Sequence, residues 1–230
     1  MKQLLTKGII LSRTDYGEAD RILTILTPEQ GKLRLMARSV RKPKSKLAGG
    51  IELFSTTDLT YMNGRGEIGT LISSRLVKYY STIVKDIDRV QLGYELIKTL
   101  HRATEDQPEP DYFNLLEQAF QALDDAQVGT DLIRLWFESR LLYLAGHSPN
   151  LRTDTAGQKL TPDQTYNFDF EAMAFTPHAS GNFKAAHIKT LRLLFSHHQP
   201  KALNQVEGLN ALLPDLTPLI RTMLTSYIRI

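Results

Sequence analysis

The hydrophobic periodicity of this chain changes near residue 76, and this change limits the folds open to it. Before that point, short apolar and β-branched runs alternate with turn residues at hairpin spacing. After it, apolar residues recur every three or four positions, which is the period of an α-helix. Strands followed by helices predict an α+β protein with more than one domain.

Five strands are predicted within residues 1–78. They correspond to the runs at 8–12, 21–27 and 32–38, then 51–54 with 57–62, and last 68–73. Turn residues such as Pro28 to Gly31 and Asn63 to Gly66 separate them. A segment this short that closes its own edges favours a compact barrel, and the oligonucleotide-binding (OB) fold is the common five-stranded form. An SH3-like barrel is the alternative on pattern alone.

Helices are predicted through most of the remaining chain. They cover 83–103, 111–123, 129–144, 183–198, 203–213 and 216–228. Residues 148–181 interrupt this pattern with several Pro and Gly and one short strand-like run. We therefore expect a helical domain of residues 79–147 plus 182–230, with a small loop-rich insert or hairpin at 148–181.

A basic run follows the third predicted strand. Residues 38–46 contain five cations, Arg38, Arg41, Lys42, Lys44 and Lys46, and no acid. Like charges within about 8–10 Å repel each other unless a polyanion such as a nucleic-acid backbone lies over them. A solvated loop without a partner is the alternative, because short basic runs often have no ligand.

Charge is also divided along the chain. Residues 1–80 contain 14 Lys or Arg and 7 Asp or Glu. Residues 81–230 contain 14 Lys or Arg and 18 Asp or Glu. Such segregation indicates separate surfaces for separate partners. We expect the basic first part to contact nucleic acid and the acidic, helical remainder to contact proteins.

Four further residues complete the predicted interface. Arg34 lies on the wet face of the third strand, and Arg65 lies at a hairpin tip, so both could border one groove with the basic run. Tyr16 and Tyr61 are candidates for base stacking. Phe54 is a third aromatic residue in this segment, and we interpret it as part of the core.

Several classes of chemistry find no support. The chain has no cysteine, which excludes disulfides, thiolate zinc sites and a cysteine nucleophile. It has no Walker A motif and no G-x-G-x-x-G, and the adjacent His197 and His198 diverge by about 100° on a helix. We predict a binding protein, not an enzyme, without metal or cofactor. With no leader-like start and no long apolar run, we expect a cytoplasmic protein.

Specific motifs resemble those of the RecO family of bacterial DNA repair proteins. They are GKLRLMAR at 31–38, RKPKSKLAG at 41–49, GRGEIGTL at 64–71 and LAGHSPNL at 144–151. Many members carry two C-x-x-C zinc pairs, where this chain has residues 154–157 and 176–179 without cysteine. Members often have Gly at the position of Ser39.

The resemblance implies a recombination mediator without enzymatic activity. Such a protein binds single- and double-stranded DNA, anneals complementary strands and associates with the nucleoid. With RecR it loads RecA onto DNA coated by single-strand-binding protein (SSB). The implied partners are DNA, RecR and the acidic C-terminal tail of SSB, with RecA and RecF as further candidates. An RNA-binding OB protein and a protein-interaction scaffold are the alternatives.

Overall fold

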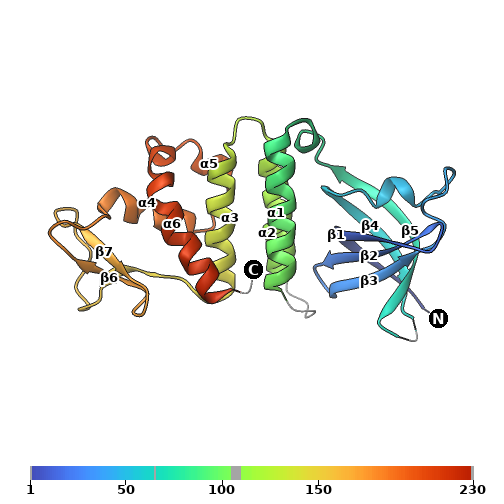
Figure 1. Ribbon diagram of the computed structural model, residues 1–230, viewed down its shortest axis with the longest axis horizontal. Helices are drawn as coiled ribbons and strands as arrows, with labels where there is room; N and C mark the ends of the chain where they lie inside the picture. Colours follow the sequence, from blue (N-terminus) through green and yellow to red (C-terminus); the bar gives the residue numbers. More distant parts are fainter. Residues whose placement is uncertain (1, 65, 105–109, 229–230) are drawn as a thin grey trace. The chain divides into compact units, whose positions relative to one another are not determined.

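The computed structural model describes residues 2–64, 66–104 and 110–228. The chain divides into two compact units, residues 1–126 and 127–230 (Figure 1). The first unit contains a barrel and two helices, and the second contains the remaining helices and a small sheet. The division into 1–78, 79–147 with 182–230, and 148–181 remains a prediction.

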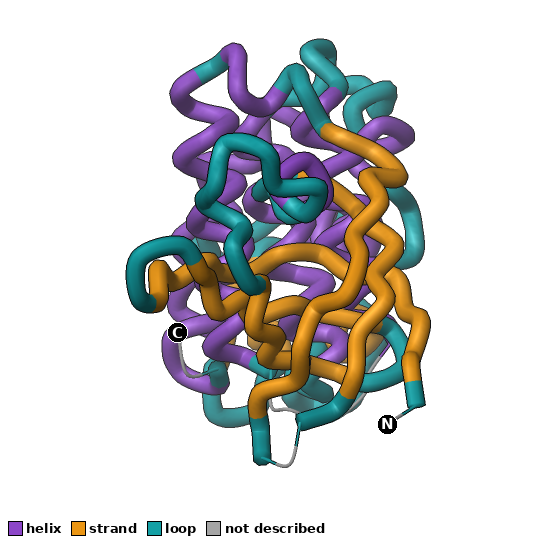
Figure 2. Tube along the Cα trace, turned by 90° about the vertical axis from the view of Figure 1, so that its right-hand side faces the viewer, coloured by secondary structure: helices purple, strands orange, loops and turns teal. Residues whose placement is uncertain are grey.

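Five strands close into a barrel in the order β1-β2-β3-β5-β4 (orange strands in Figure 2). They are β1 (Gln3–Tyr16), β2 (Asp20–Thr27), β3 (Gly31–Ala37), β4 (Ser55–Met62) and β5 (Ile68–Tyr79). Neighbouring strands are antiparallel, except that β3 and β5 pair in parallel from Arg34↔Ile68 to Met36↔Thr70. The predicted α+β fold with a five-stranded OB-like barrel before the helices is confirmed.

Strand alternation builds the barrel core. On β3, Leu35 and Ala37 are 1% and 0% exposed, whereas Arg34 on the other face is exposed. The core comprises Ile10, Leu23, Ile25, Leu35, Ala37, Val40, Ile51, Leu59, Tyr61 and Leu71. Burying one large apolar side chain of this kind contributes about 1.5–3 kcal/mol, so the alternation determines which face of each strand meets water.

Phe54 joins the barrel to helices α1 (Ile87–Ala103) and α2 (Pro110–Asp124). Its ring is 3% exposed and lies edge-on to Tyr94 and Phe120, with centroids 5.2 and 5.6 Å away. A Cβ on Gly93 of α1 would lie 2.6 Å from Cε1 of this ring. The interpretation of Phe54 as a core residue is confirmed.

Two cationic side chains cap the C-terminal ends of these helices. Lys32 of β3 donates from Nζ to the carbonyl of Thr104 at 2.5 Å, just beyond α1. Arg89, which is 7% exposed, donates to the carbonyl of Leu123 near the end of α2 at 2.8 Å. Helix ends leave carbonyls without intrahelical donors, and cations there also complement the helix dipole. These bonds fix the helical hairpin within the first unit.

The second unit combines helices with a small sheet. Its helices are α3 (Thr130–Leu144), α4 (Ala185–Leu194), α5 (Pro200–Leu203) and α6 (Leu209–Tyr227), and its strands are β6 (Asn150–Asp154), β7 (Tyr166–Asp169) and β8 (Ala174–Pro177). Within the described ranges, none of the helices has the length and apolar composition that a membrane span needs.

The segment predicted as a loop-rich insert contains a three-stranded sheet in the order β6-β8-β7. Tyr166 and Phe175 are 0% exposed and pack edge-on, with centroids 6.2 Å apart. The hydroxyls of Thr155 and Thr176 lie 3.1 Å apart, so the stretches 154–157 and 176–179 are hydrogen-bonded to each other. Aromatic packing and hydrogen bonds therefore hold this sheet together.

Replacing Gly93 by Ala tests the packing of Phe54. In an exposed helix interior this change stabilises by about 1 kcal/mol, because Ala has the higher helix propensity. Here the added Cβ meets the Phe54 ring, and we expect the free energy of unfolding to fall by about 1–3 kcal/mol in urea denaturation. In a Phe54→Leu background, Gly93→Ala should lower the free energy of unfolding by less. A gain in stability from Gly93→Ala alone would contradict the packing.

Candidate nucleic-acid interface

One arginine on the outer face of β3 and a second just beyond the end of the strand lie on either side of an apolar residue. Arg34 and Arg38 are exposed, and the half-buried Met36 lies between them along the chain. Ile22 of β2 pairs with Met36, and Ile68 of β5 pairs with Arg34. Arginine heads beside half-buried apolar side chains could contact both phosphates and the faces of bases.

The basic loop, residues 38–46, is part of the connection from β3 to β4. This connection covers residues 38–54 and includes a short 3₁₀ helix at Ala48–Gly50, seen as the light-blue coil beside the strands in Figure 1. Val40 and Ile51, on either side of the loop's lysines, are 3% and 1% exposed in the barrel core. The lysines are thus carried on a segment anchored at both ends.

Backbone hydrogen bonds add to this anchoring. The N–H of Ser39 donates to Oδ1 of Asp20 at 2.6 Å, and the N–H of Arg41 donates to the carbonyl of Ala19 at 2.9 Å. Ser39 has a φ of 54°, in the left-handed region that favours glycine. Glycine would therefore be the residue best suited to this backbone position.

The charges of the basic loop face solvent. Its exposed cations are Arg38, Arg41, Lys42, Lys44 and Lys46. In the part of the chain that the structure describes, no acidic side chain lies within ion-pair distance of Arg38 or of the three lysines. Their charge is therefore available to an external anion.

Two of the predicted cations have acidic neighbours. Arg41 Nε lies 3.5 Å from Oδ2 of Asp15, and Arg34 lies 3.9 Å from the carboxylate of Glu67. Exposed pairs of this kind contribute about 0–1 kcal/mol, so a phosphate can compete for the arginines. Asp15 also accepts a hydrogen bond from Arg21 Nε at 2.7 Å. This bond, with a smaller effect from the charge of Arg41, holds the pKa of Asp15 below its usual value.

The aromatic candidates differ in exposure. Tyr16 is 57% exposed at the end of β1, so its ring is free to stack on a base. Tyr61 is 2% exposed within the barrel core, where burial raises the pKa of its phenol. The stacking prediction for Tyr61 is corrected, because its ring packs against the core. Arg65 lies outside the described residues, and its role stays a prediction, as do the contacts of the other cations and Tyr16 with DNA.

A groove beside Arg34 was not anticipated from the sequence. It has a volume of about 490 Å³, and its lining includes Lys32, Asn63 and His101. His101 lines this groove, and its backbone carbonyl accepts a hydrogen bond from Lys32 Nζ at 3.2 Å. Strand alternation places Lys32 and Arg34 on the same face and could have indicated the groove, but nothing in the sequence near His101 links it to β3.

Comparisons with known proteins give concordant matches over both parts of the chain. The family models described as "Recombination protein O N terminal" and "Recombination protein O C terminal" match residues 1–80 and 84–229.

Curated relatives carry the corresponding name, "DNA repair protein RecO". The protein of Dehalococcoides mccartyi is 32% identical over 76% of this chain and 66% of the relative. That of Desulfatibacillum aliphaticivorans is 33% identical over 66% of this chain and 60% of the relative. That of Halalkalibacterium halodurans is 26% identical over 96% of this chain and 87% of the relative. The chain thus spans less than two thirds of the length of the first two relatives.

Replacing Ser39 by Gly should stabilise the protein without changing the charge of the basic loop. A non-glycine residue in the left-handed region costs about 1–2 kcal/mol, and the greater freedom of Gly in the unfolded chain cancels part of that gain. We expect the free energy of unfolding to rise by up to about 1 kcal/mol. Ser45→Gly, at a position outside the left-handed region, is the matched control and should destabilise. Equal effects of both changes would contradict the backbone explanation.

The pKa of Asp15 predicts a specific loss of stability in acid. A carboxyl whose pKa is lowered in the folded state stabilises the protein above its unfolded pKa of about 3.9, and this contribution disappears as the pH falls through the folded value. Urea unfolding between about pH 5 and pH 3 should therefore show a larger loss for the unmodified protein than for Asp15→Asn. Equal losses of stability in both proteins would show that the hydrogen bond from Arg21 does not lower the pKa of Asp15 in solution.

Proposed function

Because the chain belongs to the RecO family, we propose that it acts in DNA repair and recombination as a non-enzymatic mediator that binds DNA. The proposed binding surface consists of the basic loop and the outer face of β3. The observation that carries the proposal is the set of four exposed cations without acidic neighbours in the described chain, Arg38, Lys42, Lys44 and Lys46. Cations of this kind release counterions from a phosphate backbone when they bind it.

The chemistry of this surface favours binding with little sequence preference. Lysines make point-charge contacts with phosphates, and such contacts position a protein without reading bases. Phosphates are common to both forms of DNA, so the proposed ligands are single- and double-stranded DNA. Arg34, Arg41 and Tyr16 are proposed to border the same surface.

The proposed activity on bound DNA is the annealing of complementary strands. The sheet face presents Ile22 and Met36, where many single-strand binders present aromatic rings. Stacking on an aromatic ring contributes about 1–3 kcal/mol per base, and aliphatic side chains in these positions hold bases less firmly. Bases held by the backbone alone remain free to pair with a second strand.

The proposed protein partners come from family membership and from the division of charge. Residues 81–230 carry 18 acidic and 14 basic side chains, which is unfavourable for DNA and suited to protein contacts. We assign to this part the contacts with RecR and SSB, through which the protein would help to load RecA onto SSB-coated DNA. RecF is a further proposed partner.

Neutralising the lysines of the basic loop tests the proposed DNA contact. Replacing Lys42, Lys44 and Lys46 by Ser removes three exposed charges and leaves the buried anchors Val40 and Ile51 in place. We expect weaker binding of labelled oligo-dT in fluorescence anisotropy between about 50 and 200 mM salt. The slope of log K against log salt should fall by about 2, which corresponds to three lost contacts with single-stranded DNA.

A charge-matched control separates local contact from net charge. Lys98, Lys159 and Lys189 are exposed outside the barrel, and their replacement by Ser should leave the slope unchanged. An equal loss in this control, or no loss in the loop variant, would contradict the proposed surface. Competition with an RNA of the same sequence tests the RNA-binding alternative, since an RNA reader uses the 2′-hydroxyl. Absence of any DNA binding would leave the interaction scaffold as the better explanation.

A further inference from the structure

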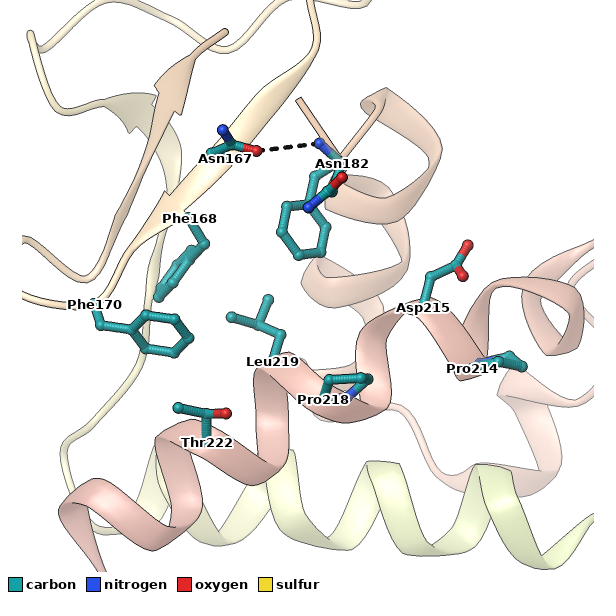
Figure 3. Close-up of a pocket in the computed structure, with 10 residues that line it drawn as sticks. Asn167, Phe168, Phe170, Asn182, Pro214, Asp215, Pro218, Leu219 and Thr222 are labelled. Carbon is teal, nitrogen blue, oxygen red and sulfur yellow. Dashed lines mark hydrogen bonds between the residues drawn. The ribbon is translucent and has the colours of Figure 1, made fainter. Parts of the chain in front are cut away.

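The second unit contains a groove between β7 and α6. Its volume is about 690 Å³, within the range of sites that bind small molecules or a few side chains. Figure 3 shows Phe168 and Phe170 on one side of Leu219 and Asp215 on the other. The backbone N–H of Asn182 donates to Oδ1 of Asn167 at 3.2 Å and ties the rim together. The groove thus has an aromatic end and an acidic end.

Two prolines line the groove, and the second removes the usual helical donor of one backbone carbonyl. Pro214 and Pro218 lie one turn apart in α6 and both line the groove. Proline has no backbone N–H, so the carbonyl of Pro214 cannot receive its helical bond from residue 218. That carbonyl points along the helix toward Pro218. An N–H donor on a ligand would satisfy it.

The only charged side chain among the described lining residues is Asp215. Its Oδ2 lies 3.1 Å from Nε2 of His187. Nδ1 of His187 accepts the backbone N–H of Lys184 at 2.9 Å and so carries no proton. Nε2–H is therefore the donor to Asp215, and the neutral ring orients the carboxylate without cancelling its charge.

We propose that this groove binds an arginine-bearing segment of a protein partner. A guanidinium combines a positive charge for Asp215, N–H donors for the free carbonyl, and a flat face for Phe168 and Phe170. A nucleic acid fits less well, because its phosphates would face Asp215 and no basic side chain among the described lining residues would neutralise them. The inference is independent of DNA binding by the barrel, since the groove lies within the second unit.

Nuclear magnetic resonance with short peptides tests this inference on the full chain. The probes are two peptides blocked at both ends, Gly-Leu-Arg-Leu-Gly and Gly-Leu-Glu-Leu-Gly, added to protein with labelled Leu, Thr and Phe side chains. The arginine peptide should shift the resonances of Leu219, Thr222 and Phe168 and bind about tenfold more tightly than the glutamate peptide. Equal binding of both peptides, absence of shifts, or the same shifts with oligo-dT would overturn the proposal.

Two variants and one control test the acidic end. Asp215→Asn should weaken binding of the arginine peptide about fivefold, which matches the contribution of an exposed ion pair. Asp163→Asn removes an exposed carboxylate that does not line the groove and should have no effect. Because Asp215→Asn also changes the contact with His187, Thr222→Arg is the second variant, since it places a tethered cation in the groove. Undiminished binding by both groove variants would overturn the proposal.

Discussion

The closure of the barrel decides where the basic loop lies. Strand β3 has β2 and β5 as neighbours, while β4 pairs with β1 and β5. The chain leaving β3 therefore cannot form a tight hairpin of about two to five residues into β4, and must cross one end of the barrel. This crossing places Val40 and Ile51 in the core and leaves the cations between them in solvent. The surface proposed to hold DNA is thus a consequence of strand order.

Anchoring also affects how such a surface would bind. The backbone around Ser39 and Arg41 is hydrogen-bonded to residues 19 and 20 in the free protein, so this part of the loop needs no ordering when a ligand arrives. The lysine side chains keep four flexible carbons beyond that fixed backbone. An anchored backbone with flexible, charged side chains suits a nucleic acid, because the positions of its phosphates vary with its conformation.

Local patterns predicted the elements of the fold, and long-range packing explains what they missed. Alternation and turn residues indicated the five strands, although β1 and β5 are longer than predicted and residues 51–54 are not part of β4. The change of period marked the first helix, but the two helices predicted at 203–213 and 216–228 are wrong, because α6 (Leu209–Tyr227) continues through residues 214 and 215. The same alternation aligns Tyr61 with the buried Leu59 on β4, so the burial of Tyr61 was readable from the sequence. By contrast, the use of Lys32 at the end of α1 depends on how that helix meets the barrel. No local signal indicated this contact, or that His101 would line the groove beside Arg34.

Packing and hydrogen bonds, without any thiolate, hold the small sheet of the second unit together. Asp154 accepts the N–H groups of Ala156 and Gln158 at 2.9 and 2.8 Å, and the hydroxyls of Thr155 and Thr176 lie 3.1 Å apart. Thiolate ligands are lost to oxidants and chelators, and a module that depends on them loses its fold as well. This chain contains no thiol. Peroxide, an agent that also damages DNA, therefore has no cysteine to attack in this sheet.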